Sequence, residues 1–395
     1  MNDATEPATI RVMVFNIEYG GTGVDLDKVI EAIRLADPDV VALEEAMGNT
    51  ARIAAALGWP SASASARTHV LSRHPLHEPA DADGLFVYVE IEPGRIVSIV
   101  NVHLPAEPFG PALLAAGGSD TDAQTLEKRV RLPALERPLA ALAPLAAAGI
   151  PVFMLGDFNA PLDLGWPVSR AIEAAGLRDT WREIHPDPFA EPGLTWPAAR
   201  PAIGRDDPVK GAREDRIDAI YAAGPSTTLD CRIVGESGRR DIALSVDPWP
   251  SDHRAIVATF RVWPAPMPRS ISPVAKPDAG SPVKLQSSQH TYRVGEPIEV
   301  TWANGPANRW DWIAVFAAPA EELRDRDVIW LHTGARVDGS LRLDGAAAIV
   351  DQSPAGGHWP LPPGDYEVAY LLDDAHERVA RAAFTIVETA YPETA

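Results

Sequence analysis

Four short apolar runs that each end on an acid, an amide or a histidine constrain this chain more than any other feature. The clearest is Val152–Leu155, which is followed by Gly156, Asp157, Phe158 and Asn159. Four consecutive apolar residues bounded by turn formers predict a strand buried on both faces, so that its polar residues lie where it leaves the core. Polar groups at such a point cost desolvation energy unless they have partners. The edge is therefore a candidate site for a metal or a phosphate.

The other three runs also end on side chains of this kind. Ile10–Phe15 precedes Asn16, Val40–Leu43 precedes Glu44 and Glu45, and Ile96–Val102 precedes His103. The last of these follows Leu85–Ile91 across a Glu-Pro-Gly turn, which predicts a β-hairpin. One such run would say little, but four of them form a recognisable set.

Helical segments separate these strands. Apolar residues recur at helical spacing from Leu26 to Ile33, behind Asp25 as an N-cap, and Thr50–Leu57 predicts a second, short helix. A third helical stretch runs from about residue 122 to residue 148. Three prolines are expected to break it into segments: Pro133, Pro138 and Pro144.

Two later runs complete the first domain. Ile217–Tyr221 contains Asp218, and Ala255–Val262 is preceded by Asp252 and His253. A carboxylate inside an apolar run needs a cation or a hydrogen-bond donor as partner. Asp218 is therefore harder to explain as a surface acid than an isolated Asp would be.

The charge of the chain limits its partners. Its 395 residues carry a formal net charge of -20, with a hydrophobic content of 46% and a charged content of 23%, so wholesale disorder is excluded. Such a field repels polyphosphate, and no basic stripe suited to a nucleic-acid backbone is evident. We therefore expect long nucleic acids to be disfavoured as substrates.

Composition also bears on compartment. No apolar run approaches the length of a membrane span, and Met1–Thr9 is polar, so we expect no transmembrane segment and no signal peptide. The chain as given is expected to be a cytoplasmic monomer, unless it is exported after removal of a leader. One cysteine, Cys231, excludes an internal disulfide framework.

A proline-rich stretch divides the chain. Residues 264–282 lack hydrophobic periodicity and predict a semi-rigid linker between a first domain, 1–263, and a second, 283–395. Beyond it, short strands with Gly/Pro turns predict an immunoglobulin-like β-sandwich. Its tryptophans are better explained as core and edge aromatics than as a sugar-binding platform, and they are Trp302, Trp310, Trp312 and Trp330.

The motifs of the first domain resemble one family. In chain order, between Arg11 and Ile256, they are RVMVFNIEYGG, PDVVALEEA, LSRHPL, VNVHLP, LGDFNAP, RIDAIY and SDHRAI. Their order and spacing are similar to those of the magnesium-dependent endonuclease/exonuclease/phosphatase superfamily, which includes deoxyribonucleases, inositol-polyphosphate phosphatases and neutral sphingomyelinases. The resemblance implies a four-layered α/β sandwich, in which two mixed β-sheets pack face to face with helices outside.

The resemblance also implies a metal site. Glu45 would be the principal ligand of Mg²⁺ or Mn²⁺, with Asn16 beside it and Asp252 as a further ligand or an outer group. A site with few carboxylates and many waters is what Mg²⁺ prefers, because this ion dehydrates reluctantly.

For catalysis, the resemblance implies five residues. Asp157 would orient or deprotonate the attacking water, and Asn159 would hold the same water or a phosphate oxygen. His253 would pair with Asp218, whose carboxylate fixes the tautomer of the imidazole, and His103 would donate to a non-bridging oxygen. Taken alone, Asn16 could instead cap a turn and His103 could be a satisfied edge histidine.

Two departures from the family pattern stand out. Glu44 stands where the family often has Gln, which adds a negative charge next to the metal ligand unless Glu44 is simply solvated at a helix start. The basic inserts with which the nuclease branches grip DNA are not evident, since residues 186–212 are mixed in charge and rich in proline.

The sequence thus predicts a metal-dependent phosphoesterase that hydrolyses a phosphodiester or phosphomonoester of a small molecule or lipid head group by activated-water attack. One alternative is a nuclease acting on DNA or RNA. Another is a binding or adhesion protein with a decayed catalytic domain, which would lack a catalytic residue, whereas every expected position here is filled. The sequence does not name the leaving group.

Overall fold

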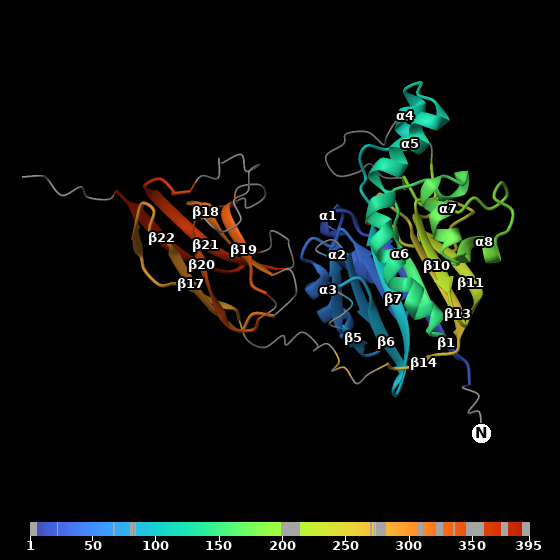
Figure 1. The fold of residues 1–395 in the computed structure, drawn as a ribbon, viewed down its shortest axis with the longest axis horizontal. Helices are drawn as coiled ribbons and strands as arrows, with labels where there is room; N and C mark the ends of the chain where they lie inside the picture. The colour runs from blue at the N-terminus through green and yellow to red at the C-terminus, as the bar shows by residue number, and fades with distance from the viewer. Residues whose placement is uncertain are drawn as a thin grey trace, which may run out of the picture. The chain divides into compact units, whose positions relative to one another are not determined.

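In the computed structural model of the chain, the residues described are 6–21, 23–65, 68–79, 82, 84–198, 214–268, 271, 273, 282–306, 311–320, 327–334, 336–344, 359–372 and 378–388. The chain divides into two compact units, Met1–Lys276 and Pro277–Ala395 (Figure 1). None of the described helices is long and apolar enough to cross a membrane.

The first unit is built on two β-sheets. In spatial order, the first contains β12 (Leu244–Ser245), β11 (Ser226–Gly235), β13 (Ala255–Val262), β1 (Ala8–Asn16), β2 (Val40–Glu44), β4 (Thr68–Ser72) and β3 (Ser61–Ser65). The second contains β5 (Leu76–His77), β6 (Val87–Glu92), β7 (Arg95–His103), β8 (Val152–Asp157), β10 (Asp218–Ala223) and β9 (Arg178–Asp179). β1 with β2 and β7 with β8 pair in parallel, whereas β13, β6 and β10 pair antiparallel with their neighbours.

Alternate side chains of the central strands belong to different cores. In β1, Val12 and Val14 join the core between the two sheets, whereas Met13 and Phe15 join a core with helix α2 (Leu26–Ala36) and helix α3 (Thr50–Leu57). Such strands are buried on both faces. Helices therefore cover the outer face of the first sheet.

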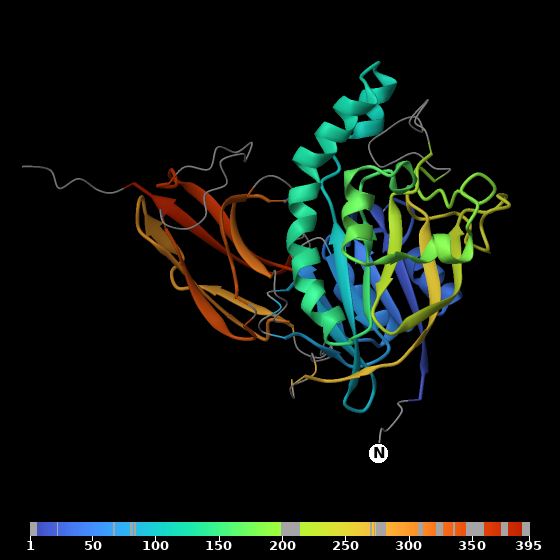
Figure 2. The ribbon, with the colours of Figure 1, turned by 45° about the vertical axis from the view of Figure 1, so that its right-hand side comes forward.

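The second sheet has the same arrangement. Met154 of β8 packs in an outer core with Leu135 and Leu142 of helix α6 (Leu132–Ala147), which lies along this sheet in Figure 2. Helix α7 (Pro167–Ala174) joins the same core through Ile172. The layers are helix, sheet, sheet and helix, so the predicted four-layered α/β sandwich is confirmed.

The prolines of the long helical stretch behave differently from the prediction. The stretch is broken once, at Arg131, between helix α5 (Asp120–Val130) and α6, where Pro133 lies in the first turn of α6. Pro138 and Pro144 lie inside α6, so the breaks expected there were wrong. Each costs a hydrogen bond to the carbonyl four residues earlier, but those carbonyls belong to exposed alanines, and packing against the sheet holds the helix together.

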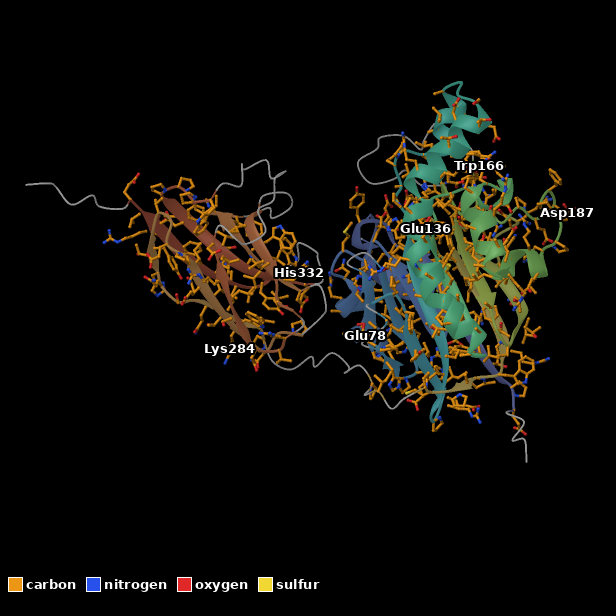
Figure 3. All side chains as sticks on the ribbon, viewed as in Figure 1. Glu78, Glu136, Trp166, Asp187, Lys284 and His332 are labelled. Carbon is orange, nitrogen blue, oxygen red and sulfur yellow. The ribbon has the colours of Figure 1, made fainter. Side chains whose placement is uncertain are left out.

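Helix α5 contains a buried carboxylate. Glu127 is 1% exposed, on a helix that packs against α7. At the start of α7, Trp166 (labelled in Figure 3) donates from Nε1 to Asp120 Oδ1 of α5 at 3.1 Å. Burial raises the pKa of Glu127 to about 7, and the amide of Val168 and the guanidinium of Arg131 offset this only in part. The carboxyl group is therefore protonated in the folded protein over a pH range in which the unfolded chain ionises it.

This arrangement predicts that stability falls as pH rises. Between pH 4.5, the ordinary pKa, and about 7, the unfolded chain binds fewer protons than the folded protein, so the free energy of unfolding decreases. The full separation corresponds to about 3 kcal/mol. We expect Glu127→Gln to lose this dependence, so that its stability relative to wild type improves by about 2–3 kcal/mol between pH ~5 and pH ~8 in urea unfolding. Parallel stability profiles for the two proteins would contradict this.

The stretch 264–282, predicted as a linker, begins as part of the first unit. Ala265 and Pro266 form β14, which pairs with Ile96 and Arg95 of β7. β8 pairs with β7 only from Ser98 onward, so this end of β7 has an edge to which β14 can add. Residues 269, 270, 272 and 274–281 lie outside the described residues.

The second unit contains two β-sheets. One has the order β15 (Lys284–Ser287), β17 (Ile298–Ala303) and β20 (Gly339–Leu343); the other has β16 (Thr291–Arg293), β22 (Arg378–Val387), β21 (Gly364–Leu371), β18 (Trp312–Ala317) and β19 (Asp327–His332). Val300, Ile313 and Val368 pack in the core that the sheets share. The all-β region is as predicted, and its immunoglobulin-like character stays a prediction.

The tryptophans of this unit take different positions. Trp302 and Trp312 are 4% and 5% exposed, and Trp330 packs edge-on against Trp312 with ring centroids 5.9 Å apart. Trp310 lies outside the described residues. The three that are described pack as core and edge aromatics.

Candidate active site

Strand ends from both sheets bring the predicted residues together. In the first sheet, Asn16 at the end of β1 pairs with Glu44 of β2. In the second, Asp157 of β8 lies between His103 of β7 and Asp218 of β10. The register of the two sheets thus fixes the spacing of these side chains.

The end of β8 requires a glycine. Gly156 has φ +148°, and a Cβ atom there would lie 1.8 Å from the carbonyl oxygen of Val102. Any larger residue would push β8 away from β7. The spacing of His103 and Asp157 therefore depends on the glycine between the apolar run and the carboxylate.

Asn16 lies at the centre of the cluster. Its Nδ2 is 3.0 Å from Asp157 Oδ2, 3.5 Å from Glu45 Oε1 and 3.5 Å from His253 Nε2. Its Oδ1 accepts a hydrogen bond from the amide of Glu18 at 3.0 Å. An Asn side chain binds a metal through oxygen. In this orientation Asn16 acts instead as a donor that fixes two carboxylates, which differs from the ligand role that the resemblance implies.

Asp157 is held by donors on both of its oxygens. Oδ1 accepts from the amide of Asn159 at 2.8 Å, and Oδ2 accepts from Asn159 Nδ2 at 3.1 Å as well as from Asn16. Asn159 Nδ2 also donates to the carbonyl of Leu104 at 3.0 Å. His103 Nε2 lies 3.6 Å from Asp157 Oδ2 and 3.9 Å from Glu45 Oε1. The amide of Asn159 therefore orients the carboxylate in this structure.

His253 and Asp218 form a buried pair. His253 Nδ1 lies 3.0 Å from Asp218 Oδ2, so that this nitrogen carries the proton and Nε2 is directed at the cluster, 3.8 Å from Asp157 Oδ2. Ser251 supports the loop, because its hydroxyl donates to the carbonyl of Asn16 at 2.7 Å and accepts from the amide of His253 at 3.0 Å. A serine thus ties the histidine loop to β1.

The electrostatics of the pair favour a charged imidazole. Burial by itself lowers the pKa of His253, but the carboxylates of Asp218, Asp252 and Asp157 outweigh it, and the net pKa lies well above its ordinary value. Burial raises the pKa of Asp157 to about 7, opposed by the His253 charge and reinforced by Asp218. The site therefore holds a cationic histidine beside a carboxyl group that titrates near neutral pH.

Glu44 is a core residue, not a solvated one. It is 0% exposed, and burial, together with the charges of Asp218 and Asp157, raises its pKa well above the ordinary value. A neutral carboxyl group resembles the Gln that the family often has at this position. The solvated helix start considered for Glu44 was wrong, because Glu44 is the last residue of β2 and its side chain is fully buried.

Backbone strain is concentrated at the site. Seven non-glycine residues in the described part of the chain have positive φ, and five of them lie in site loops: Glu18, Tyr19, Glu45, Met47 and Asn159. Glu45 has φ +56°, and its Oε2 accepts from the amide of Tyr19 at 3.2 Å. Such conformations cost on the order of 1–3 kcal/mol each and persist only where the surroundings impose them.

The residues present fit a divalent cation. Asp157, Asp218 and His253 lie together, with polar atoms all within 4.8 Å of one another, and the two carboxylates offer oxygens to a cation, whereas the charged ring of His253 has no lone pair to offer. Asp218 Oδ1 is buried without a hydrogen-bond partner among the described residues, and an orphaned carboxylate oxygen of this kind suits a hard cation. The predicted ligands Glu45 and Asp252 lie next to this group. Glu45 Oε1 is 3.5 Å from Asn16 Nδ2, and Asp252 Oδ1 is 3.8 Å from His253 Nε2.

Two residues of the site were missed in the sequence. Trp196 donates from Nε1 to Asp252 Oδ2 at 3.2 Å, and the hydroxyl oxygen of Thr195 accepts from the amide of Asp218 at 3.1 Å. Both lie in the proline-rich stretch, where no hydrophobic period marks them. A polar Thr beside an aromatic residue in a loop was the only signal, and it is a weak one.

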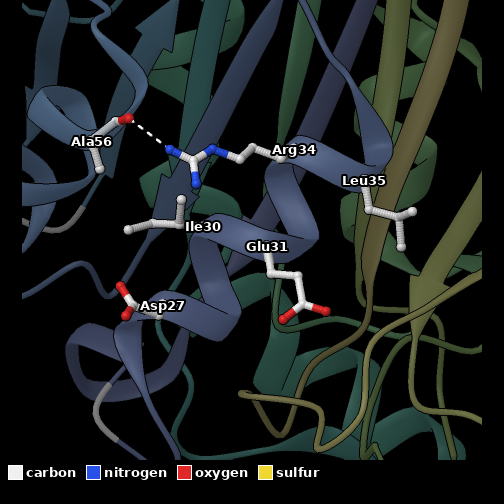
Figure 4. Close-up of a pocket in the computed structure, with 6 residues that line it drawn as sticks. All are labelled: Asp27, Ile30, Glu31, Arg34, Leu35 and Ala56. Carbon is white, nitrogen blue, oxygen red and sulfur yellow. Dashed lines mark hydrogen bonds between the residues drawn. The ribbon is translucent and has the colours of Figure 1, made fainter.

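A separate hollow of about 710 Å³ lies between α2 and α3 (Figure 4). Its lining residues are Asp27, Ile30, Glu31, Arg34, Leu35 and Ala56, and Arg34 Nη2 donates to the carbonyl of Ala56 at 2.9 Å. No member of the cluster around Asn16 lines it. The hollow is therefore distinct from the candidate active site.

Several known proteins are similar to this chain at low sequence identity. An uncharacterized protein of Caenorhabditis elegans is 26% identical over 292 residues, which are 64% of this chain and 91% of that protein. A similar solved structure is an endonuclease/exonuclease/phosphatase of Beutenbergia cavernae, with 17% identity and a TM-score of 0.39, covering 95% of this chain and 99% of that one. Another is the human Nocturnin catalytic domain with bound sulfate, with 17% identity and a TM-score of 0.39, covering 64% of this chain and 97% of that one. Residues 13–253 match the family model described as Endonuclease/Exonuclease/phosphatase family, and this chain belongs to that family.

Proposed function

We propose that this protein is a phosphoesterase, dependent on Mg²⁺ or Mn²⁺, that hydrolyses a phosphodiester or phosphomonoester of a small molecule or lipid head group. Members of the family are hydrolases that act on phosphate esters. The observation that carries the proposal is the buried group of Asp157, Asp218 and His253, with Asn159 and Asn16 hydrogen-bonded to the first carboxylate. This group contains both a base and a cationic donor.

In this proposal, Asp157 takes the proton of the attacking water. Both its oxygens are oriented by amide donors, and a pKa of about 7 allows it to accept a proton near neutral pH. Asn159 would accept a hydrogen bond from the same water through Oδ1, because both hydrogens of its Nδ2 are donated to Asp157 and Leu104. Positioning of this kind increases the rate, because a water held next to the phosphorus makes the reaction effectively unimolecular.

His253 would stabilise the negative charge that develops on the phosphoryl group. Asp218 occupies Nδ1, so the N–H at Nε2 of the charged ring is directed at the site. His103, whose Nε2 lies near Asp157 and Glu45, would donate to a second oxygen. Glu45 and Asp252 would hold the cation, with the carboxylate group of Asp157 close by. When bound, the cation would supply Lewis-acid stabilisation of phosphoryl charge.

Charge favours a small substrate. A protein of net charge -20 has little counterion-release energy to gain from a nucleic-acid backbone, and that energy supplies most non-specific affinity. A small ester escapes this penalty, because the two histidines and a cation would neutralise one phosphoryl group locally. A complete set of site residues also argues against a decayed binding protein.

The test is a panel of nucleotides, sugar phosphates, phospholipids and duplex DNA, assayed with Mg²⁺, with Mn²⁺ and with EDTA. We expect a small ester to be hydrolysed with higher kcat/KM than duplex DNA, EDTA to remove the activity, and Asp157→Asn to be the inactive control. Efficient cleavage of duplex DNA at physiological salt would support the nuclease alternative. No turnover of any ester would support a binding protein.

A further inference from the structure

We infer that Thr195 is a positioning residue that holds Asp218 and His253 at hydrogen-bond distance from one another. The inference rests on the proposed function only for its kinetic test. Thr195 lies in the loop before β10 and is 0% exposed. Its hydrogen bonds reach the backbone of Asp218 and of the residue after His253.

One residue contacts the backbone on both sides of the pair. The hydroxyl oxygen of Thr195 accepts from the amides of Ile217 and Asp218, each at 3.1 Å. Its carbonyl oxygen accepts from the amide of Arg254, the residue after His253, at 2.8 Å. Thr195 therefore connects the start of β10 to the loop that leads into β13.

Neighbouring contacts strengthen this connection. The amides of Thr195 and Trp196 both donate to the carbonyl of Asp215, at 3.1 and 3.0 Å, and the amide of Ala198 donates to the carbonyl of Asp252 at 2.6 Å. The guanidinium of Arg254 donates from Nη1 to the carbonyl of Leu194 at 3.1 Å. Residues 194–198 are thus hydrogen-bonded both to the segment before β10 and to the loop before β13. The hydroxyl of Thr195 is the side-chain group in this segment that binds the amide of Asp218.

The chemistry of this contact makes the hydroxyl difficult to replace. Valine has the shape of threonine but no acceptor, so Thr195→Val would leave two buried N–H groups without a partner. The start of β10 would then shift toward other acceptors or water, and Asp218 would move with it. Serine keeps the oxygen, so Thr195→Ser should preserve the contact.

The chain offers a matched control, Thr180, whose hydroxyl contacts the same strand, β10. Thr180 is also 0% exposed, and its hydroxyl donates to the carbonyl of Ile220 in β10 at 2.7 Å. Thr180→Val removes a buried hydroxyl that binds this strand away from the catalytic pair. It should lower the stability of the fold as Thr195→Val does, without acting on Asp218.

The kinetic test uses the full chain with Mg²⁺ and bis(p-nitrophenyl) phosphate. We expect Thr195→Val to lower kcat by a factor on the order of 10², as for a misplacement of about 1 Å, with Thr195→Ser and Thr180→Val close to wild type. In an Asp218→Asn background, the further loss from Thr195→Val should largely disappear, because both changes act through the same pair. An equal loss in Thr180→Val, or full additivity with Asp218→Asn, would overturn the inference.

A second measurement does not depend on activity. In protein labelled with ¹⁵N at histidine, the Nδ1–H proton of His253 reports its hydrogen bond to Asp218. Its resonance should move upfield or disappear in Thr195→Val and stay in place in Thr195→Ser and Thr180→Val. An unchanged resonance in folded Thr195→Val would overturn the inference. If wild type hydrolyses no ester, the proposed function fails, while this spectrum still decides the role of Thr195.

Discussion

His253→Ala is expected to lower kcat/KM for a small phosphate ester by about 10²–10⁴-fold, because it removes the charged donor from the site. Asp218→Asn should have a comparable effect, since Asp218 fixes the Nδ1 proton of the ring from 3.0 Å. If Asp218 acts only through His253, the double variant should be no worse than His253→Ala. Steady-state kinetics of the three variants with one substrate measures this directly.

A matched control is available for this comparison. His77 is 3% exposed and also pairs with a carboxylate, since its Nε2 lies 2.8 Å from Glu90 Oε2, and it belongs to no part of the candidate active site. We expect His77→Ala to keep kcat/KM near the wild-type value. Losses that add in the Asp218 and His253 double variant would show that the two side chains act independently.

Glu45→Gln is expected to raise the concentration of Mg²⁺ needed for half-maximal activity by about 10- to 100-fold or more. Removing one carboxylate from a site with few protein ligands takes away a large part of the attraction for the cation. Titration calorimetry with Mn²⁺ gives the same quantity without turnover. Glu31→Gln, on the exposed surface of α2, serves as the control. An unchanged metal requirement in Glu45→Gln would remove Glu45 from the set of ligands.

The parts of the fold that could be predicted are those in which local pattern and burial agree. Helix α2 follows Asp25, whose side chain accepts from the amide of Asp27 as an N-cap, as predicted, and its last residue is Ala36. The strands that end on Asn16 and Asp157 were recognisable because Val12–Phe15 and Val152–Leu155 are continuous apolar runs that lead directly to the polar residues. Pro138 and Pro144 were misjudged for the opposite reason, since the packing that keeps α6 continuous comes from the sheet below it.

The site divides in the same way. Asp157, Asp218 and His253 could be proposed from short motifs, because each lies next to an apolar run. Thr195 could not, since its partners are 22 and 23 residues away in sequence and the loop has no period. The state of Glu44 was also out of reach, because its environment consists of Asp157 and Asp218 on the other sheet.

Each of the two sheets contributes half of the catalytic group. The first sheet and its loops supply Asn16, Glu45 and His253. The second supplies His103, Asp157 and Asp218 from the ends of β7, β8 and β10. Phe153 and Phe260 meet between the sheets with ring centroids 4.5 Å apart. Phe153→Leu would remove ring contacts from this layer. We expect the two sheets then to shift relative to one another while each sheet stays folded. On heating, we expect activity to be lost several degrees below the temperature at which the circular dichroism signal changes. Directed evolution for thermal tolerance should therefore begin in the apolar layer between the sheets.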